Sequence, residues 1–307
     1  MNTAPPSLRE GRLEAALKAL ELTVRIRLDG LLQGNHLGLV PGPGSELGEA
    51  RAYEPGDDVR RIDWAVTART SEAHVRQTVA DRELETWVLV DLSPSLDFGT
   101  AACEKRDLAI AALAAVAHLT RGGGNRIGAL VATGEQLVRL PARGGLAYAR
   151  GLVRQVAQVP SAPSGTRGDL TAAIETLRRP PRRRGLAVVV SDFLGEPDWE
   201  STLRALSGRH ELLAIEVLDP RELELPDVGL LTVVDPESGQ SLEVPTGDAG
   251  FRQRFASGAA EQRAAIARAL RRAGAGHLQL RTDRDWLMDV VRFVADRRRA
   301  GTGGASR

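Results

Sequence analysis

The sequence predicts an α/β fold in which a mostly parallel β-sheet is covered by helices on both faces. Short apolar runs typical of buried strands alternate with longer segments of helical periodicity from Trp87 onward. Strands that alternate with helices usually lie parallel in one sheet, and the helices then pack on both of its faces. A length of 307 residues, with 42% hydrophobic and 26% charged residues, suits a globular protein with one large or two modest domains.

The first part of the chain, residues 1–85, is predicted to contain a helix followed by an irregular region. Ser7 and Glu10 have the spacing of a capping box, and apolar residues then recur at helical intervals as far as Val24. Glycine and proline are too frequent for regular structure from Gly34 to Gly56. We therefore expect a shaped loop region between the first helix and the sheet.

The second part, residues 86–299, is predicted to contain the sheet and its helices. Strands are expected at Trp87–Val90, 126–132, 135–141 as an edge strand, 185–192, 211–218 and 277–282. Helices are expected at about 104–120, 146–158, 170–178, 199–206, 251–273 and 285–299. Two short runs around a glycine-containing turn predict a β-hairpin insertion near residues 228–246. Residues 300–307 have low complexity and are expected to form a disordered tail.

Polar side chains follow two of the predicted strands. Asp91, Ser93 and Ser95 come directly after the first strand, at alternate positions that would point to the same side of an extended chain. Ser191 and Asp192 follow another strand, and ligands of parallel sheets bind beyond the carboxyl ends of the strands. Carboxylate and hydroxyl oxygens suit Mg²⁺, which prefers hard ligands in octahedral geometry. The pattern therefore predicts a cation site at this edge.

A purely structural role is the alternative for the same side chains. Ser93 and Ser95 would then cap the next helix, while the carboxylate of Asp91 would accept hydrogen bonds from loop amides. Runs of acid and hydroxyl residues are common, so the second acid, Asp192, is what favours the cation site.

Four motifs, in order along the chain, resemble domain-of-unknown-function family 58, a family with the von Willebrand factor type A fold. The motifs read "RAYEPGDDVRRIDWAVTAR", "VDLSPSLDFG", "VVVSDFLG" and "DPRELELPDVG". The resemblance extends from about Gly34 to Arg299 and implies a von Willebrand factor A-like, Rossmann-like sheet. It also implies a metal-ion-dependent adhesion site, written Asp-x-Ser-x-Ser, and association with MoxR-type AAA+ ATPases.

The sequence departs from the family pattern at one implied metal ligand. The family fold usually has a threonine just before a helix, and the matching segment "SGTRGDLTAAIETL" has Gly168 at that position. Thr166, Asp169 and Thr171 are the possible substitutes. The metal ligands implied by the resemblance are taken as Asp91, Ser93, Ser95, Thr166 and Asp192, with Mg²⁺ as the ion.

The segment "YEPGDDVRRIDW" concentrates charged residues next to a tyrosine and a tryptophan. Its carboxylates could form an acid/base pair or a surface that binds a partner. Alternatively, the segment is a Pro-Gly turn held by Asp–Arg pairs, with Trp64 as a packing anchor. We favour the turn over catalysis, and we assign partner binding to Tyr53, Asp57, Asp58, Arg60, Asp63 and Trp64.

Composition excludes several classes of function. Forty-one basic and forty acidic side chains give a net charge of +1, so no overall field favours nucleic acid or an anionic membrane. The single cysteine, Cys103, excludes an internal disulfide and a cysteine-rich zinc site. The longest uncharged apolar stretch, Leu108–Thr120, is shorter than the roughly 20 residues of a membrane span. We therefore expect no integral membrane segment and a cytoplasmic location.

These observations favour a non-enzymatic protein-binding or adaptor module. The family resemblance implies that it acts with a MoxR-type AAA+ ATPase in assembling or remodelling a client protein. The alternative is a magnesium-dependent phosphoester hydrolase centred on Asp91 and Asp192. A basic, phosphate-holding pocket beside these acids would favour the hydrolase.

Overall fold

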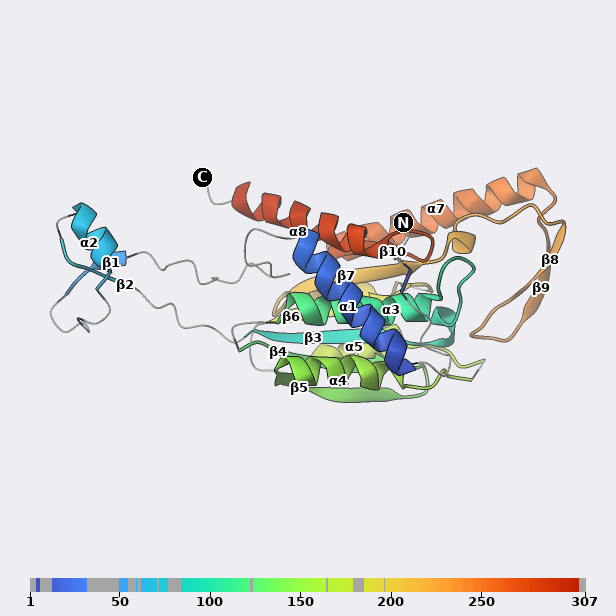
Figure 1. Cartoon of the computed structure of the whole chain (residues 1–307). Coiled ribbons are helices and arrows are strands. Elements are labelled where there is room, and N and C mark those ends of the chain that lie inside the picture. Colours follow the sequence, from blue (N-terminus) through green and yellow to red (C-terminus); the bar gives the residue numbers. More distant parts are fainter. Residues whose placement is uncertain are drawn as a thin grey trace. The chain divides into compact units, whose positions relative to one another are not determined.

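A six-stranded sheet forms the centre of the larger of the two units into which the chain divides (Figure 1). The larger unit comprises Met1–Val40 and Leu84–Arg307, and the smaller comprises Pro41–Glu83. This computed structural model describes residues 4–5, 13–31, 50–54, 59, 62–70, 72–76, 84–121, 124–163, 165–178, 185–195 and 197–303.

The strands of the sheet lie in the order β10-β7-β6-β3-β4-β5. They are β3 (Glu85–Asp91), β4 (Arg126–Ala132), β5 (Leu137–Gly144), β6 (Leu186–Ser191), β7 (Glu211–Leu218) and β10 (Gly276–Arg281). All neighbours are parallel except β4 and β5, which pair antiparallel at one edge. The predicted mostly parallel sheet and its edge strand are thus confirmed.

Helices cover both faces of this sheet. One face carries α1 (Leu13–Leu31), α3 (Lys105–Leu119), α4 (Leu146–Ala157) and α8 (Trp286–Gly303); the other carries α5 (Leu170–Arg178), α6 (Trp199–Ser207) and α7 (Ala249–Arg272). Within β3, Val88 and Val90 pack into the first core, whereas Trp87 and Leu89 pack into the second. This alternation explains why the strand is apolar throughout.

Helix α1 belongs to the larger unit although the smaller unit follows it in the sequence. Its residues Leu20, Val24 and Leu28 are buried in the core that also contains α3. None of the helices in the described residues combines the length and the apolar character that crossing a membrane requires.

The remaining elements are short. The smaller unit contains β1 (Ala50–Ala52), α2 (Trp64–Thr70) and β2 (His74–Arg76), with β1 and β2 antiparallel. In the larger unit, 3₁₀ helices η2 (Pro94–Leu96) and η3 (Pro220–Glu222) follow β3 and β7. Strands β8 (Leu230–Val234) and β9 (Ser241–Pro245) form the predicted hairpin between β7 and α7.

Candidate functional site

The carboxyl ends of β3 and β6 bring the predicted acids and hydroxyls together. Val90 pairs with Val190, so Asp91 and Ser191 end adjacent strands at the same level. Asp91 is only 8% exposed. Its Oδ1 accepts the backbone N–H of Ser93 at 3.0 Å, and its Oδ2 accepts the hydroxyl of Ser191 at 2.7 Å. The carboxylate therefore receives hydrogen bonds from both strand ends.

The second acid lies in the same cluster but has a different partner. Asp192 accepts the ammonium of Lys105 on Oδ2 at 2.8 Å and the backbone N–H of Leu194 on Oδ1 at 3.2 Å. The Oγ atoms of Ser93 and Ser95 lie 3.3 Å apart, and Ser95 also hydrogen-bonds to Asp192. The structure thus connects the predicted residues of the two loops.

The two carboxylates differ in their electrostatic surroundings. Burial, followed by the negative charge of Asp192, raises the pKa of Asp91 despite the hydrogen bonds from the neighbouring serines. Burial also tends to raise the pKa of Asp192, but the charge and hydrogen bond of Lys105 outweigh it, and the pKa is lowered. Within the part of the chain that the structure describes, Asp91 is thus the acid of this pair without a positive partner.

Lys105 was not among the predicted site residues. It is fully buried in the first turn of α3, and its ammonium also donates to Glu222 in η3. Burial by itself would lower the pKa of Lys105. The charges and hydrogen bonds of Asp192 and Glu222 outweigh this effect and raise the pKa above its usual value, so the side chain stays charged. Glu222 in turn accepts the backbone N–H of Asp219 in a capping box, which fixes its position.

A buried polar network supports this edge from β7 and α7. Arg263 donates from one nitrogen to the backbone oxygen of Asp192 at 2.9 Å and to Glu216 at 3.0 Å. The other carboxylate oxygen of Glu216 lies 2.7 Å from Nε2 of His277 and 2.8 Å from Nε2 of Gln279. Helix α7 is thereby tied to the loop that carries Asp192.

The threonine position of the family pattern lies beside the hydroxyl cluster. A Cβ built on Gly168 would be 3.0 Å from Cβ and 3.3 Å from Oγ of Ser93. Thr166 was predicted to replace the missing threonine ligand. Its Cγ2 methyl group instead lies against Gly134, 2.9 Å from the position that a Cβ built on this glycine would take. The segment approaches the cluster at Gly168, whereas Thr166 packs against the turn between β4 and β5.

The described residues contain no group of three or more His, Cys, Asp and Glu side chains arranged to hold a metal ion. A cation at this edge would therefore depend on two carboxylates and on hydroxyl oxygens. Asp91, Ser93, Ser95 and Asp192 supply such a set, and its hard oxygen chemistry fits Mg²⁺.

The second predicted group falls in the smaller unit. Asp63 is buried, and its Oδ1 accepts the N–H of Val66 at 3.3 Å, so it caps α2. The Tyr53 N–H donates to the Ala73 carbonyl at 2.7 Å. Trp64 is 71% exposed, so the prediction that it is a packing anchor is wrong. Asp57, Asp58 and Arg60 lie outside the described residues.

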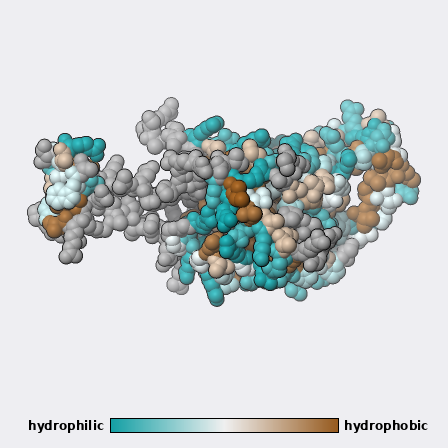
Figure 2. Space-filling view, in the orientation of Figure 1, coloured by the Kyte–Doolittle hydropathy of each residue, from teal (hydrophilic) through white to brown (hydrophobic). Residues whose placement is uncertain are grey.

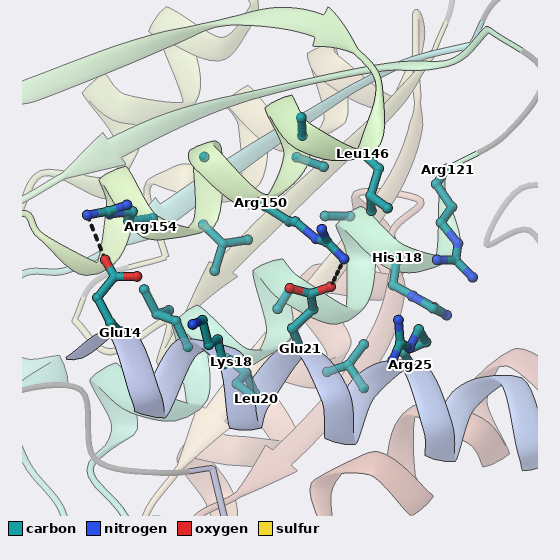
Figure 3. Close-up of a pocket in the computed structure, with 18 residues that line it drawn as sticks. Glu14, Lys18, Leu20, Glu21, Arg25, His118, Arg121, Leu146, Arg150 and Arg154 are labelled. Atoms are coloured by element: carbon teal, nitrogen blue, oxygen red, sulfur yellow. Dashed lines mark hydrogen bonds and ion pairs between the residues drawn. The ribbon is translucent and has the colours of Figure 1, made fainter. Parts of the chain in front are cut away.

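A separate pocket of about 420 Å³ lies between α1, α3 and α4 (Figure 3). Its floor includes the apolar residue Leu20, and two ion pairs, Glu14–Arg154 and Glu21–Arg150, join α1 to α4 across it. Its lining includes none of the predicted oxygen ligands. The pocket is thus distinct from the candidate cation site.

Comparison with known proteins identifies relatives of this chain. A family model described as "Protein of unknown function DUF58" matches residues 49–265. The uncharacterized proteins Rv1480 of Mycobacterium tuberculosis and Mb1516 of Mycobacterium bovis are each 60% identical to it over 305 residues, which is 98% of this chain and 96% of theirs.

Among solved structures, BatB from Bacteroides thetaiotaomicron is similar at 15% identity with a TM-score of 0.43. The match covers 69% of this chain and 98% of that one.

Proposed function

This chain belongs to the DUF58 family, and we propose that it is a non-enzymatic protein-binding module whose carboxyl-edge site is a metal-ion-dependent adhesion site for Mg²⁺. In this proposal the sheet is von Willebrand factor A-like. The module acts with a MoxR-type AAA+ ATPase in assembling or remodelling a client protein. The ATPase and the client come from the family resemblance, whereas the cation comes from the site itself.

One observation carries the cation proposal. Asp91 is buried, yet its carboxylate accepts hydrogen bonds from neutral groups of Ser93 and Ser191, and no Lys, Arg or His of the described residues pairs with it. A buried carboxylate without a positive partner is costly. Mg²⁺, when bound, would supply that charge and offer a coordination position to an acidic side chain of a partner.

The residues proposed to hold the ion are those already in contact. Asp91 and Asp192 would provide carboxylate oxygens, and Ser93 and Ser95 would provide hydroxyls. The hydrogen bonds from Ser191 and Lys105 would orient the two carboxylates, as outer partners orient ligands in other metal sites.

The hydrolase alternative gains no comparable support. A phosphoester substrate needs basic groups beside the acids. At this edge, within the part of the chain that the structure describes, the buried cations Lys105 and Arg263 are already paired with Asp192, Glu222 and Glu216. The pocket between α1 and α4 is lined by other residues.

Isothermal titration calorimetry with MgCl₂ tests the cation site. We expect the wild type to bind Mg²⁺ weakly and Asp91→Ala to abolish binding while remaining folded. Asp248→Asn is the matched control, because Asp248 is an exposed cap of α7 and asparagine caps equally well. A wild type that releases no heat and shows no change in melting temperature with Mg²⁺ would refute the site.

The partner is tested with the purified ATPase by biolayer interferometry, with Mg²⁺ and with chelator. The Ser93→Ala, Ser95→Ala double variant should weaken a Mg²⁺-dependent association. Each hydroxyl is expected to contribute about 1–2 kcal/mol, which corresponds to roughly 5- to 30-fold in affinity. Equal binding with Mg²⁺ and chelator, unaffected in the double variant, would place the contact elsewhere.

A further inference from the structure

The pocket between α1, α3 and α4 is an apolar space that the carboxyl-edge site does not use. Its volume of about 420 Å³ falls within the roughly 300–1,000 Å³ of pockets that hold small molecules. Packed helices normally leave few voids larger than a water molecule between them. A space of this size between three helices is therefore large enough to hold a ligand.

Each of the three helices supplies apolar side chains to the wall of the pocket. Helix α3 contributes Ala114 and Ala117, whose short side chains leave the space between α1 and α4 open. The larger apolar side chains of the wall include Leu20 and Val24 of α1 and Leu146 and Val153 of α4. An alkyl chain placed here would leave water and contact apolar atoms on several sides, whereas a polar ligand would lose hydrogen bonds to water.

Basic side chains dominate the rim of the pocket. Five Lys and Arg side chains line it against two carboxylates, so the lining carries an excess of three positive charges with His118 neutral. The whole chain, by comparison, carries a net charge of +1. The surface over α1 is largely hydrophilic (Figure 2), so the apolar wall lies beneath charged side chains. This distribution favours a ligand with an apolar body and an anionic end.

Two of the five cations are available to such an anion. The other three pair with acids, as Glu14–Arg154, Glu21–Arg150 and Asp29–Arg121. Lys18 and Arg25 form no ion pair with any residue that the structure describes. Arg25 lies at the end of the pocket that also carries His118 and Arg121 (Figure 3). A guanidinium can bind a carboxylate through two parallel hydrogen bonds, so Arg25 is suited to hold the anionic end.

The ion pairs that cross the pocket favour a narrow ligand. Glu14 and Glu21 are two helical turns apart on α1, and each joins α1 to an arginine of α4 (Figure 3). A partner's helix is about 10 Å across with its side chains and would have to break both pairs to lie along the groove. A single alkyl chain is thin enough to lie between the helices with both pairs intact.

We propose that this pocket binds a fatty carboxylate, with its alkyl chain between α1, α3 and α4 and its carboxylate beside Arg25. The proposal is independent of the cation site, because the two sites share no residue.

Gly151 offers a way to fill the pocket without disturbing the fold. It lines the pocket within α4, and a Cβ built on it would have no neighbouring atom within 4 Å. Gly151→Leu should therefore raise the melting temperature, because leucine favours a helix more than glycine does. Gly258→Leu is the matched control, since Gly258 lies within α7, its Cβ would also meet nothing within 4 Å, and it does not line the pocket.

Isothermal titration calorimetry of the full-length protein with sodium decanoate measures binding. We expect the wild type and Gly258→Leu to bind decanoate equally, and Gly151→Leu to bind it at least roughly 10-fold more weakly. Octanoate, with two methylenes fewer, should bind the wild type roughly 10-fold more weakly than decanoate.

The position of the carboxylate is tested separately. Arg25→Gln should weaken decanoate binding roughly 10-fold and leave the weaker binding of decanol unchanged. Arg268→Gln removes the same charge from an exposed position on α7 and should match the wild type with both ligands.

Three results would overturn the proposal. The first is a wild type that binds no decanoate, including the case in which a glutamate-rich amphipathic peptide binds instead and Gly151→Leu blocks it, which would make the groove a protein-binding surface. The second is equal decanoate affinity in Gly151→Leu and the wild type, which would place the ligand elsewhere. The third is equal affinity for decanoate and decanol with no effect of Arg25→Gln, which would remove the role of the carboxylate.

Discussion

Replacing Lys105 with methionine should destabilise the protein strongly. Lys105 is fully buried, and its ammonium donates to Asp192 at 2.8 Å and to Glu222. Methionine keeps most of the side-chain length but removes the cation that pairs with Asp192, while Glu222 retains Arg263 at 3.9 Å. Removing one member of a buried ion pair costs about 3–5 kcal/mol, which is a large fraction of the roughly 5–15 kcal/mol that stabilises a typical domain.

Urea denaturation followed by tryptophan fluorescence measures this loss. Three of the four tryptophans, Trp87, Trp199 and Trp286, are buried and report unfolding of the larger unit. Lys18→Met is the matched control, because Lys18 is exposed on α1 and should change stability by no more than about 0.5 kcal/mol. Equal losses in the two variants, both below about 1 kcal/mol, would refute the role of Lys105 as the internal counter-ion.

The same variant tests whether a divalent ion reaches Asp192. A ligand that binds only the folded state stabilises it in proportion to RT ln(1 + [L]/Kd). If Mg²⁺ replaces part of the charge lost in Lys105→Met, it should raise the stability of this variant more than that of the wild type. Equal stabilisation of both would show that Lys105 and the ion do not share the carboxylate.

Three further predictions concern single positions. Asp219→Ala should lower the free energy of unfolding by about 2–4 kcal/mol, because the buried carboxylate accepts hydrogen bonds from Thr100 and Thr282. Asp219→Asn should lower the free energy of unfolding, measured by urea denaturation, by a smaller amount. Equal losses in the two variants would contradict this account. Burial by itself would raise the pKa of Glu216, but the hydrogen bonds from His277 and Gln279 and the charge of Arg263 lower it overall. The stability that the Glu216 carboxylate contributes is therefore present above its unfolded-state pKa and is lost as the pH falls through its folded-state pKa. Melting temperatures should therefore fall less steeply below about pH 4 in Glu216→Gln than in the wild type, and parallel curves would contradict it. Gly168→Thr should speed hydrogen exchange in the hairpin turn, because threonine extends beyond a Cβ that would already contact the Glu237 carboxylate. Gly168→Ala should speed exchange to a smaller extent. Unchanged exchange in both variants would argue against this contact.

The sheet and its helices could be predicted because their signals are local. The predicted bounds of β4, α5 and β7 are those of the structure, since apolar runs and helical spacing are properties of consecutive residues. The convergence of Asp91 and Asp192 also followed from the pattern, because parallel strands bring their carboxyl ends to one edge.

The partners of these acids could not be read from the sequence. Lys105 opens a helix within the run "EKRD", where charged residues are normally exposed. Its burial depends on where the loop after β6 and the helix η3 after β7 meet, which places Asp192 and Glu222 around it. Trp64 shows the opposite error, since an aromatic side chain expected to anchor a turn is exposed.

The position of Gly168 acquires a meaning only in the folded chain. In the sequence it is a missing threonine, which counts against a metal site. In the structure it leaves room for Glu237, a residue 69 positions further along the chain, beside Ser93. The site then has three acids near its hydroxyls, while Lys105 is shared between Asp192 and Glu222. Burial and the charges of Asp192 and Asp91 raise the pKa of Glu237, so the departure from the family pattern adds negative charge near this edge. Since no three acids of the described residues are arranged to hold a metal ion, that charge does not replace the missing ligand.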